Sequence, residues 1–290
     1  MTEPTNPTAS KNTLESLNGS LGFNKLVRGR DGLFLANIND LYVGRSLLAY
    51  GEYSYEESLI LQRIVQPGDV ALEIGANIGA HTVGLAKKSG PAGRVIAYEP
   101  QTVVFQNLCA NIALNSIVNT ECHQAAVGSK SGTITLPNTR YDVQGNFGGI
   151  QVGSHAQGTE VPLVTIDDTF KFDRLKLIKV DVEGMEHDVI EGARGIISKF
   201  KPFLYVENDR LDKSEALIGL IRSMEYRLWW HYAHLFNPQN FAGEKNNIYG
   251  DGGAGQEHVS LNMICAHRSV TVNIGAPEVT NDREHPLRDL

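Results

Sequence analysis

The sequence has few cysteines, no long apolar run and no excess of basic residues. Its three cysteines, Cys109, Cys122 and Cys265, are odd in number and lack metal-binding spacing, which favours core thiols in a reducing compartment. No apolar run approaches the roughly 20 residues that cross a bilayer, so we expect no membrane span. A formal net charge of −7 argues against nucleic acid as the main partner, because phosphate binding needs a basic surface.

The two ends of the chain are polar and lack a regular apolar pattern. Residues 1–20 are rich in Thr, Asn, Ser and Pro and contain no apolar segment typical of a signal peptide, so we expect a disordered tail and a cytoplasmic protein. Residues 271–290 are predicted to form a second tail. The remaining residues, 21–270, are sufficient for one α/β domain.

Strand and helix patterns alternate five times within this domain. Apolar strands are expected at 70–75, 94–99, 120–127, 175–180 and 203–206, with helices around 55–66, 79–89, 105–115, 189–197 and 217–224. Such alternation predicts an α/β fold with a parallel, doubly wound sheet. A β-ribbon is expected within 133–164. Two further strand-like pieces, 226–229 and 260–266, predict an antiparallel end to the sheet.

The most informative motif is a glycine turn between the first two strands. An apolar run over 70–74 enters Gly75-Ala-Asn77-Ile-Gly79, and the second strand ends at Glu99. Glycines allow a close approach to a ligand, and a carboxylate at the second strand end suits two ribose hydroxyls. Because Glu73 stands beside the turn and Asn77 replaces a dinucleotide-type glycine, S-adenosylmethionine fits better than NAD. S-adenosylmethionine carries a methionine ammonium where NAD carries a pyrophosphate, so a carboxylate beside the turn is favourable for it.

Four blocks of the sequence resemble the FkbM family of S-adenosylmethionine-dependent methyltransferases. They are residues 73–82, Glu99-Pro100, 126–128 and the block Ile-Lys-Val-Asp-Val-Glu-Gly-Met-Glu at 178–186. The resemblance covers about 53–208 and implies a class I methyltransferase fold, a Rossmann-like three-layer sandwich, over the domain at 21–270. It also implies O-methylation of a hydroxyl on a sugar, a glycan or a glycosylated natural product.

The donor site is expected around the glycine turn and the neighbouring strand ends. Tyr53 and Ser54 are placed to close over the methionine end, whereas Ala126 and Val127 lie where adenine would rest. Asn77 could donate a hydrogen bond to the donor's carboxylate. The full set of expected cofactor-binding residues is Tyr53, Ser54, Glu73, Gly75, Asn77, Gly79, Glu99, Pro100, Ala126, Val127 and Asp181.

The reacting groups should lie beyond the carboxyl ends of the strands. Asp181 follows the fourth strand, and Glu207-Asn208 follows the fifth, which gives an oxygen-rich set suited to Mg²⁺. Alternatively, Asp181 contacts the cofactor or acceptor directly. His231 and His234 are candidate general bases beside an aromatic segment, so the predicted catalytic residues are Asp181, His231 and His234.

The motifs specify the methyl donor and leave the acceptor open. A hydroxyl or amine on a polyketide or peptide is the alternative to a sugar hydroxyl. An NAD(P)-dependent oxidoreductase would require a third glycine and a Tyr-x-x-x-Lys pair, which the sequence lacks. The expected partner is a small-molecule or glycan acceptor, with homo-oligomer formation left open. Acceptor choice is assigned to the segment after Trp229.

Overall fold

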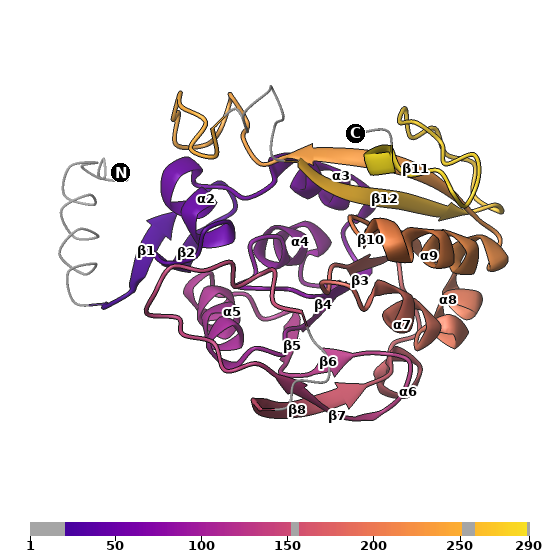
Figure 1. The fold of residues 1–290 in the computed structure, drawn as a ribbon, viewed down its shortest axis with the longest axis horizontal. Helices are drawn as coiled ribbons and strands as arrows, with labels where there is room; N and C mark the ends of the chain where they lie inside the picture. Colours follow the sequence, from indigo (N-terminus) through magenta and orange to yellow (C-terminus); the bar gives the residue numbers. More distant parts are fainter. Residues whose placement is uncertain (1–20, 152–156, 251–258, 289–290) are drawn as a thin grey trace.

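A seven-stranded sheet forms the centre of the computed structural model, which describes residues 21–151, 157–250 and 259–288 (Figure 1). The strand order within these residues is β11-β12-β10-β9-β3-β4-β5. The parallel strands are β3 (Val70–Ile74), β4 (Arg94–Tyr98), β5 (Thr120–His123), β9 (Leu177–Val180) and β10 (Phe203–Glu207). Between β10 and β11 (Tyr226–His234), β12 (Val259–His267) runs antiparallel to both. The predicted parallel sheet with antiparallel last strands is confirmed.

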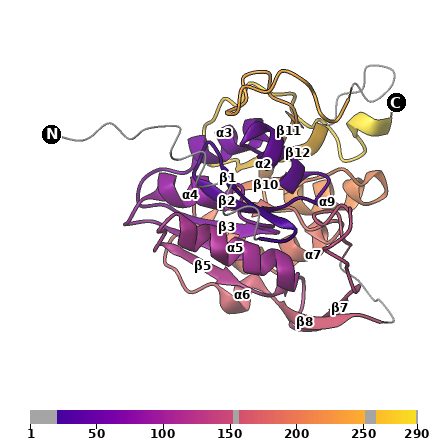
Figure 2. The same cartoon turned by 90° about the vertical axis from the view of Figure 1, so that its left-hand side faces the viewer.

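Helices cover both faces of the sheet and produce three layers (Figures 1 and 2). One face carries α3 (Tyr55–Ile64), α4 (Thr82–Ser89) and α5 (Thr102–Leu114), and the other carries α7 (Glu186–Glu191), α8 (Arg194–Phe200) and α9 (Leu211–Ser223). Alternate residues of a strand belong to different layers, so Ile178 packs in the core beneath α7–α9 and Leu177 packs beneath α3 and α4. Burial on both faces explains the continuous apolar runs of the sequence. The architecture is that of a class I methyltransferase.

Several elements lie outside the main sheet. The chain begins its described part with a hairpin of β1 (Asn24–Arg28) and β2 (Leu33–Asn37), followed by α2 (Val43–Tyr50). A smaller sheet contains β6 (Ala126–Val127), β8 (Thr159–Val164) and β7 (Gly132–Leu136) and precedes α6 (Ile166–Thr169). A short 3₁₀ helix, η1, spans Pro286–Arg288. Among the described residues, none of the helices has the length and apolarity needed to cross a bilayer.

Two expected elements are divided in the structure. The strand expected at 120–127 becomes β5 in the main sheet and β6, which pairs with β8 instead. The helix expected at 189–197 becomes α7 and α8, with the break at Gly192. The Gly192 carbonyl accepts a hydrogen bond from the Asp167 N–H at 3.0 Å, and a Cβ at Gly192 would lie 2.0 Å from the Gly128 carbonyl oxygen. Tertiary contacts therefore divide both periodic patterns.

Within the segment expected as a C-terminal tail, residues 277–279 lie along the edge strand β11. The Trp230 N–H donates to the Pro277 carbonyl at 2.8 Å, and the Val279 N–H donates to the Leu228 carbonyl at 2.9 Å. Val279 is 3% exposed. Since β11 is an edge strand, its outer backbone groups need partners, and this segment supplies them. The tail expected at 1–20 lies outside the described residues.

Candidate functional site

The glycine turn after β3 is shaped by close approaches within the chain. Gly75 has a φ of +82°, and a Cβ there would lie 1.7 Å from the Asp181 carbonyl oxygen. At Gly79, also at φ +82°, a Cβ would lie 2.8 Å from the Leu108 side chain of α5. Asn77 adopts a φ of +52° and accepts a hydrogen bond from the Ile78 N–H at its own Oδ1. The turn thereby brings the end of β3 against the end of β9.

Glu99 is fixed at the base of this turn. One carboxylate oxygen accepts from the Asn77 N–H at 3.1 Å, and the other accepts from the Gln101 N–H at 2.9 Å. The side chain is buried, and burial raises the pKa of Glu99 to about 7, although the two backbone hydrogen bonds oppose the shift. Each oxygen retains a second lone-pair direction for a ligand hydroxyl.

A narrow, largely apolar pocket lies beside Glu99. The expected cofactor-binding residues Pro100, Ala126 and Val127 all line it, so the structure brings these three residues together. The other apolar side chains in this pocket are Ile74, Tyr98, Ala125, Ile150, Val182 and Met185. Its apolar lining suits an aromatic base.

A larger cavity of about 290 Å³ adjoins the turn and extends over the ends of β3, β9 and β10. Of the expected site residues, those that line it are Tyr53, Glu73, Gly75, Asn77, Glu99, Asp181 and Glu207. Ser54 and Gly79 are not among its lining residues. Ser54 is fully buried, and its hydroxyl donates to Glu57 at 2.8 Å. It therefore holds Glu57 in place and does not contact the cavity itself.

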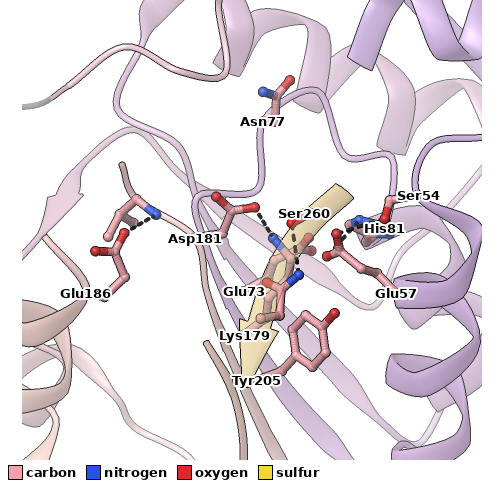
Figure 3. Close-up of polar contacts among 12 residues, drawn as sticks. Ser54, Glu57, Glu73, Asn77, His81, Lys179, Asp181, Glu186, Tyr205 and Ser260 are labelled. Atoms are coloured by element: carbon pink, nitrogen blue, oxygen red, sulfur yellow. Dashed lines mark hydrogen bonds and ion pairs between the residues drawn. The ribbon is translucent and has the colours of Figure 1, made fainter. Parts of the chain in front are cut away.

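Lys179 is a buried cation at the floor of this cavity (Figure 3). It is 2% exposed, and its Nζ lies 2.9 Å from Asp181 Oδ2. Glu73 is its register partner on β3, which places both side chains on the same face of the sheet. Burial alone lowers the pKa of Lys179, but the surrounding carboxylates, Asp181 first, outweigh it and raise the pKa. The lysine is therefore charged and holds Asp181 toward the cavity.

Two buried carboxylates complete this charged group. Glu73 accepts from the Thr82 hydroxyl at 2.7 Å, and burial raises its pKa to about 7. Glu57, on α3, is 2% exposed, and burial raises its pKa as well. Sequence reasoning missed Glu57 and Lys179. Both could have been found from the sequence, because each is a charged residue at a core position of an apolar pattern. Lys179 lies within the strand 177–180, and Glu57 lies four residues before buried Leu61.

Three carboxylates gather above this floor. Asp181, Glu183 and Glu207 each offer an oxygen, and these oxygens lie within 4.8 Å of one another. Arg210 pairs with Glu183 at 2.7 Å. Burial, together with the neighbouring carboxylates, raises the pKa of Glu207 well above its ordinary value and that of Glu183 to about 7. This wall of the cavity is strongly acidic.

The side chain of Asn208, which was expected in this group, points away from it. Its side chain donates to Ser214 Oγ at 2.9 Å and contacts Met263 Sδ at 3.3 Å, and the residue is 3% exposed. Consecutive residues at a strand end point to opposite faces, so Glu207 faces the cavity while Asn208 faces α9. Glu183 occupies the place expected for Asn208.

His231 and His234, the candidate general bases, do not line the cavity. His231 Nδ1 lies 2.7 Å from the Tyr205 hydroxyl, and His234 Nδ1 lies 2.9 Å from Glu56 Oε2. Both are on the edge strand β11, which β12 separates from the end of β10. His81, in contrast, lines the cavity.

A glycine turn, a fixed carboxylate at the next strand end and an apolar pocket beside it define the donor site of a class I methyltransferase. Comparison of the sequence with known families agrees: the Methyltransferase FkbM domain matches residues 73–228, more than half of the chain. The chain belongs to the FkbM methyltransferase family.

Individual relatives are distant. The chain is 24% identical over 142 residues to Methyltransferase 1 of Beauveria bassiana, a match covering 42% of this chain and 57% of that protein. It is 26% identical over 154 residues to Methyltransferase sdnD of Sordaria araneosa, covering 42% and 59%. A solved FkbM methyltransferase from Methylobacillus flagellatus is 17% identical with a TM-score of 0.44, covering 78% of this chain and 55% of that one. The matches to the two curated relatives thus span under two thirds of their lengths.

Proposed function

We propose that this protein transfers the methyl group of S-adenosylmethionine to a hydroxyl of a sugar, a glycan or a glycosylated natural product. The observation that carries the proposal is the composition of the cavity beyond the donor site. Half-buried Tyr42 and Tyr53 line it together with Asp181, Glu207 and Asn146. Aromatic rings pack on the apolar faces of sugars, and carboxylate and amide oxygens accept hydrogen bonds from their hydroxyls.

The donor is assigned to the adjoining part of the site. Adenine is placed in the pocket of Pro100, Ala126 and Val127, and the ribose hydroxyls at Glu99. The methionine end then extends into the larger cavity past the glycine turn, toward Glu73 and Tyr53. This assignment is supported by the continuity of the two spaces, since Gly75, Glu99 and Asp181 line both.

Asp181 is proposed as the group that binds the acceptor hydroxyl and receives its proton. Its side chain is 31% exposed toward the cavity, whereas the Lys179 side chain beneath it is 3% exposed. The ion pair fixes the carboxylate in one orientation, which aligns a hydroxyl for in-line displacement at the sulfonium. His231 and His234 are not retained in this role.

An amine acceptor on a peptide or polyketide is the second candidate. The observation that favours it is the acidic wall, where Glu183, Glu207 and Asp209 stand beside Asp181. Such a wall attracts a cation and disfavours an acceptor carrying phosphate or carboxylate.

We also propose that a divalent cation binds at the same wall. The residues that would bind it differ from those expected from the sequence. Asp181, Glu183 and Glu207 supply hard oxygen donors close enough to share one ion, which suits Mg²⁺. Bound there, the ion would lower the pKa of an acceptor hydroxyl. Asn208 is excluded from this set by its contacts with Ser214 and Met263.

The proposal is tested by measuring S-adenosylhomocysteine release with a panel of neutral sugars, glycosides, amino sugars and sugar phosphates. We expect turnover with a neutral sugar or glycoside, and loss of at least about a hundredfold in Asp181→Asn with the donor affinity retained. Turnover confined to amines would favour the second candidate, and unchanged turnover in Asp181→Asn would remove that residue from the mechanism. Repeating the assay in EDTA tests the cation, because full activity in chelator excludes it.

A further inference from the structure

A short irregular segment, residues 141–150, borders both spaces of the proposed donor site, and we call it the strap. Its Gly148 lines the apolar pocket and the larger cavity alike. Glu99 also lines both, so Gly148 stands where the ribose is proposed to bind. A Cβ at Gly148 would lie 3.1 Å from Asn77 Nδ2, so the strap runs next to the glycine turn. A ribose at Glu99 would therefore lie between the glycine turn and the strap.

One side of the strap is held by Asp40, which precedes α2. This residue is 4% exposed, and its carboxylate accepts a hydrogen bond from the Phe147 N–H of the strap. The same carboxylate accepts from the N–H groups of Tyr42 and Gly44, at 3.2 and 2.8 Å. An isolated parallel bridge also pairs Asp40 with Gly145. A single buried carboxylate thus joins the strap to the start of α2.

The other side of the strap is held by Gln101. Its side-chain amide donates to the Phe147 carbonyl at 2.8 Å and accepts from the Tyr141 hydroxyl at 3.0 Å. The rings of Tyr141 and Phe147 pack with their centroids 4.9 Å apart, and Phe147 is 4% exposed. The backbone N–H of Gln101 donates to Glu99 at 2.9 Å. The residue that fixes the ribose carboxylate therefore also fixes the strap.

These two anchors decide where the strap backbone lies. Asp40 holds the N–H of Phe147 and Gln101 holds its carbonyl, and Gly148 follows Phe147 directly. A shift of Phe147 would therefore move Gly148 away from the ribose position. Glycine at positions 148 and 149 lets the backbone approach a ligand closely, because no side chain intervenes.

We propose that Asp40 and Gln101 position the strap over the ribose and thereby set the rates at which the methyl donor enters and its product leaves. Opening the strap breaks the hydrogen bonds to Phe147, so a variant that lacks one of them opens more readily. Asp40 and Tyr141 are not among the described residues that line either space, so they act on the donor only through the strap. The inference rests on the donor site of the proposed function and is independent of the acceptor.

Exchange kinetics of the full chain test this role. Rapid mixing with radiolabelled S-adenosylmethionine measures association, and a chase with unlabelled donor measures dissociation. Asp40→Ser keeps one oxygen for the Gly44 N–H and removes the acceptor of the Phe147 N–H, so it should speed dissociation at least about tenfold. Tyr141→Phe removes one neutral hydrogen bond and keeps the ring packing, so about threefold is expected. Both variants should also speed association, because the strap opens more readily for entry.

The two rates together separate positioning from a merely structural role. A variant that only destabilises the fold lowers the fraction of protein that binds and leaves both rate constants unchanged. Both rates within about twofold of the wild type, or faster dissociation with unchanged association, would overturn the proposal. Asp142→Asn is the matched control, because Asp142 lies on the strap but pairs only with exposed Arg140 in an ion pair of 2.7 Å; its rates should equal those of the wild type.

Two further results keep the test decisive. If Asp40→Ser fails to fold, Tyr141→Phe still probes the strap, since it removes a single hydroxyl. If the wild type binds no S-adenosylmethionine in calorimetry, the proposed donor site itself is wrong, and the strap is refuted with it. Donor binding with unaltered exchange in Asp40→Ser and Tyr141→Phe refutes the strap alone.

Discussion

Glu99 and Asp181 are both carboxylates at strand ends, yet the structure gives them different surroundings. Glu99 is 4% exposed and accepts two backbone N–H groups, so it is held as part of the turn. Asp181 is half-buried, and its partner is a lysine ammonium. The first arrangement suits binding of neutral hydroxyls, and the second holds a partly exposed carboxylate in a fixed orientation toward the cavity.

The replacement Glu99→Ala should weaken S-adenosylmethionine binding by about 1–3 kcal/mol, because the ribose hydroxyls lose a charged acceptor in a buried site. Calorimetric titration measures the change. Glu121→Ala serves as the control. Glu121 lies on β5, the strand next to β4, and its side chain is 50% exposed. Equal affinities in the wild type and Glu99→Ala would refute the ribose assignment.

At the scale of elements, the site depends on which face of a strand each residue occupies. β9 carries Ile178 and Val180 into the core beneath α7–α9, whereas Lys179 points toward α3 and α4. That alternation brings Lys179 to Glu73 of β3 and to Glu57 of α3. The buried cation therefore ties β3, β9 and α3 together at the cavity floor.

Removing this cation should destabilise the fold. Lys179→Met leaves Asp181, Glu73 and Glu57 without their compensating charge, and breaking a buried pair in this way typically costs about 3–5 kcal/mol. Urea unfolding measures the free energy difference. Exposed Lys130→Met should change the stability by less than about 0.5 kcal/mol. A Lys179→Met protein as stable as the wild type would show that the buried charges do not depend on this lysine.

For the whole molecule, the buried carboxylates imply that stability without ligand depends on pH. Burial raises the pKa of Glu73 and of Glu99 to about 7, above the ordinary value of 4.5. The folded state thus binds more protons than the unfolded state between these values, and stability falls as the pH rises through this window. A cationic donor would offset the negative charge that accumulates.

We therefore expect the ligand-free protein to lose stability between about pH 5 and pH 7, by up to about 3 kcal/mol for each carboxylate. Thermal unfolding across this range measures the slope. Glu73→Gln should flatten it, and exposed Asp142→Asn should leave it unchanged. A slope that is the same in Glu73→Gln and the wild type would contradict the assignment to Glu73.

Local patterns predicted the parts of the site that directly follow an apolar strand. The turn at Gly75–Gly79 and the carboxylates Glu99 and Asp181 all follow apolar strands, and the structure places all of them at one edge of the sheet. The hairpin before α2 and the packed segment after Pro277 gave no comparable signal, because short edge pairings depend on distant partners.

The sequence by itself determined the fold class and the glycine turn and predicted the methyl donor, because each depends on residue types at short and regular spacing. Only the tertiary structure decided that Glu183 replaces Asn208 in the acidic wall, that His231 and His234 lie away from the cavity and that His81 faces it. The physical reason is that strand order and side-chain face decide which distant residues meet. Neither can be obtained from spacing along the chain.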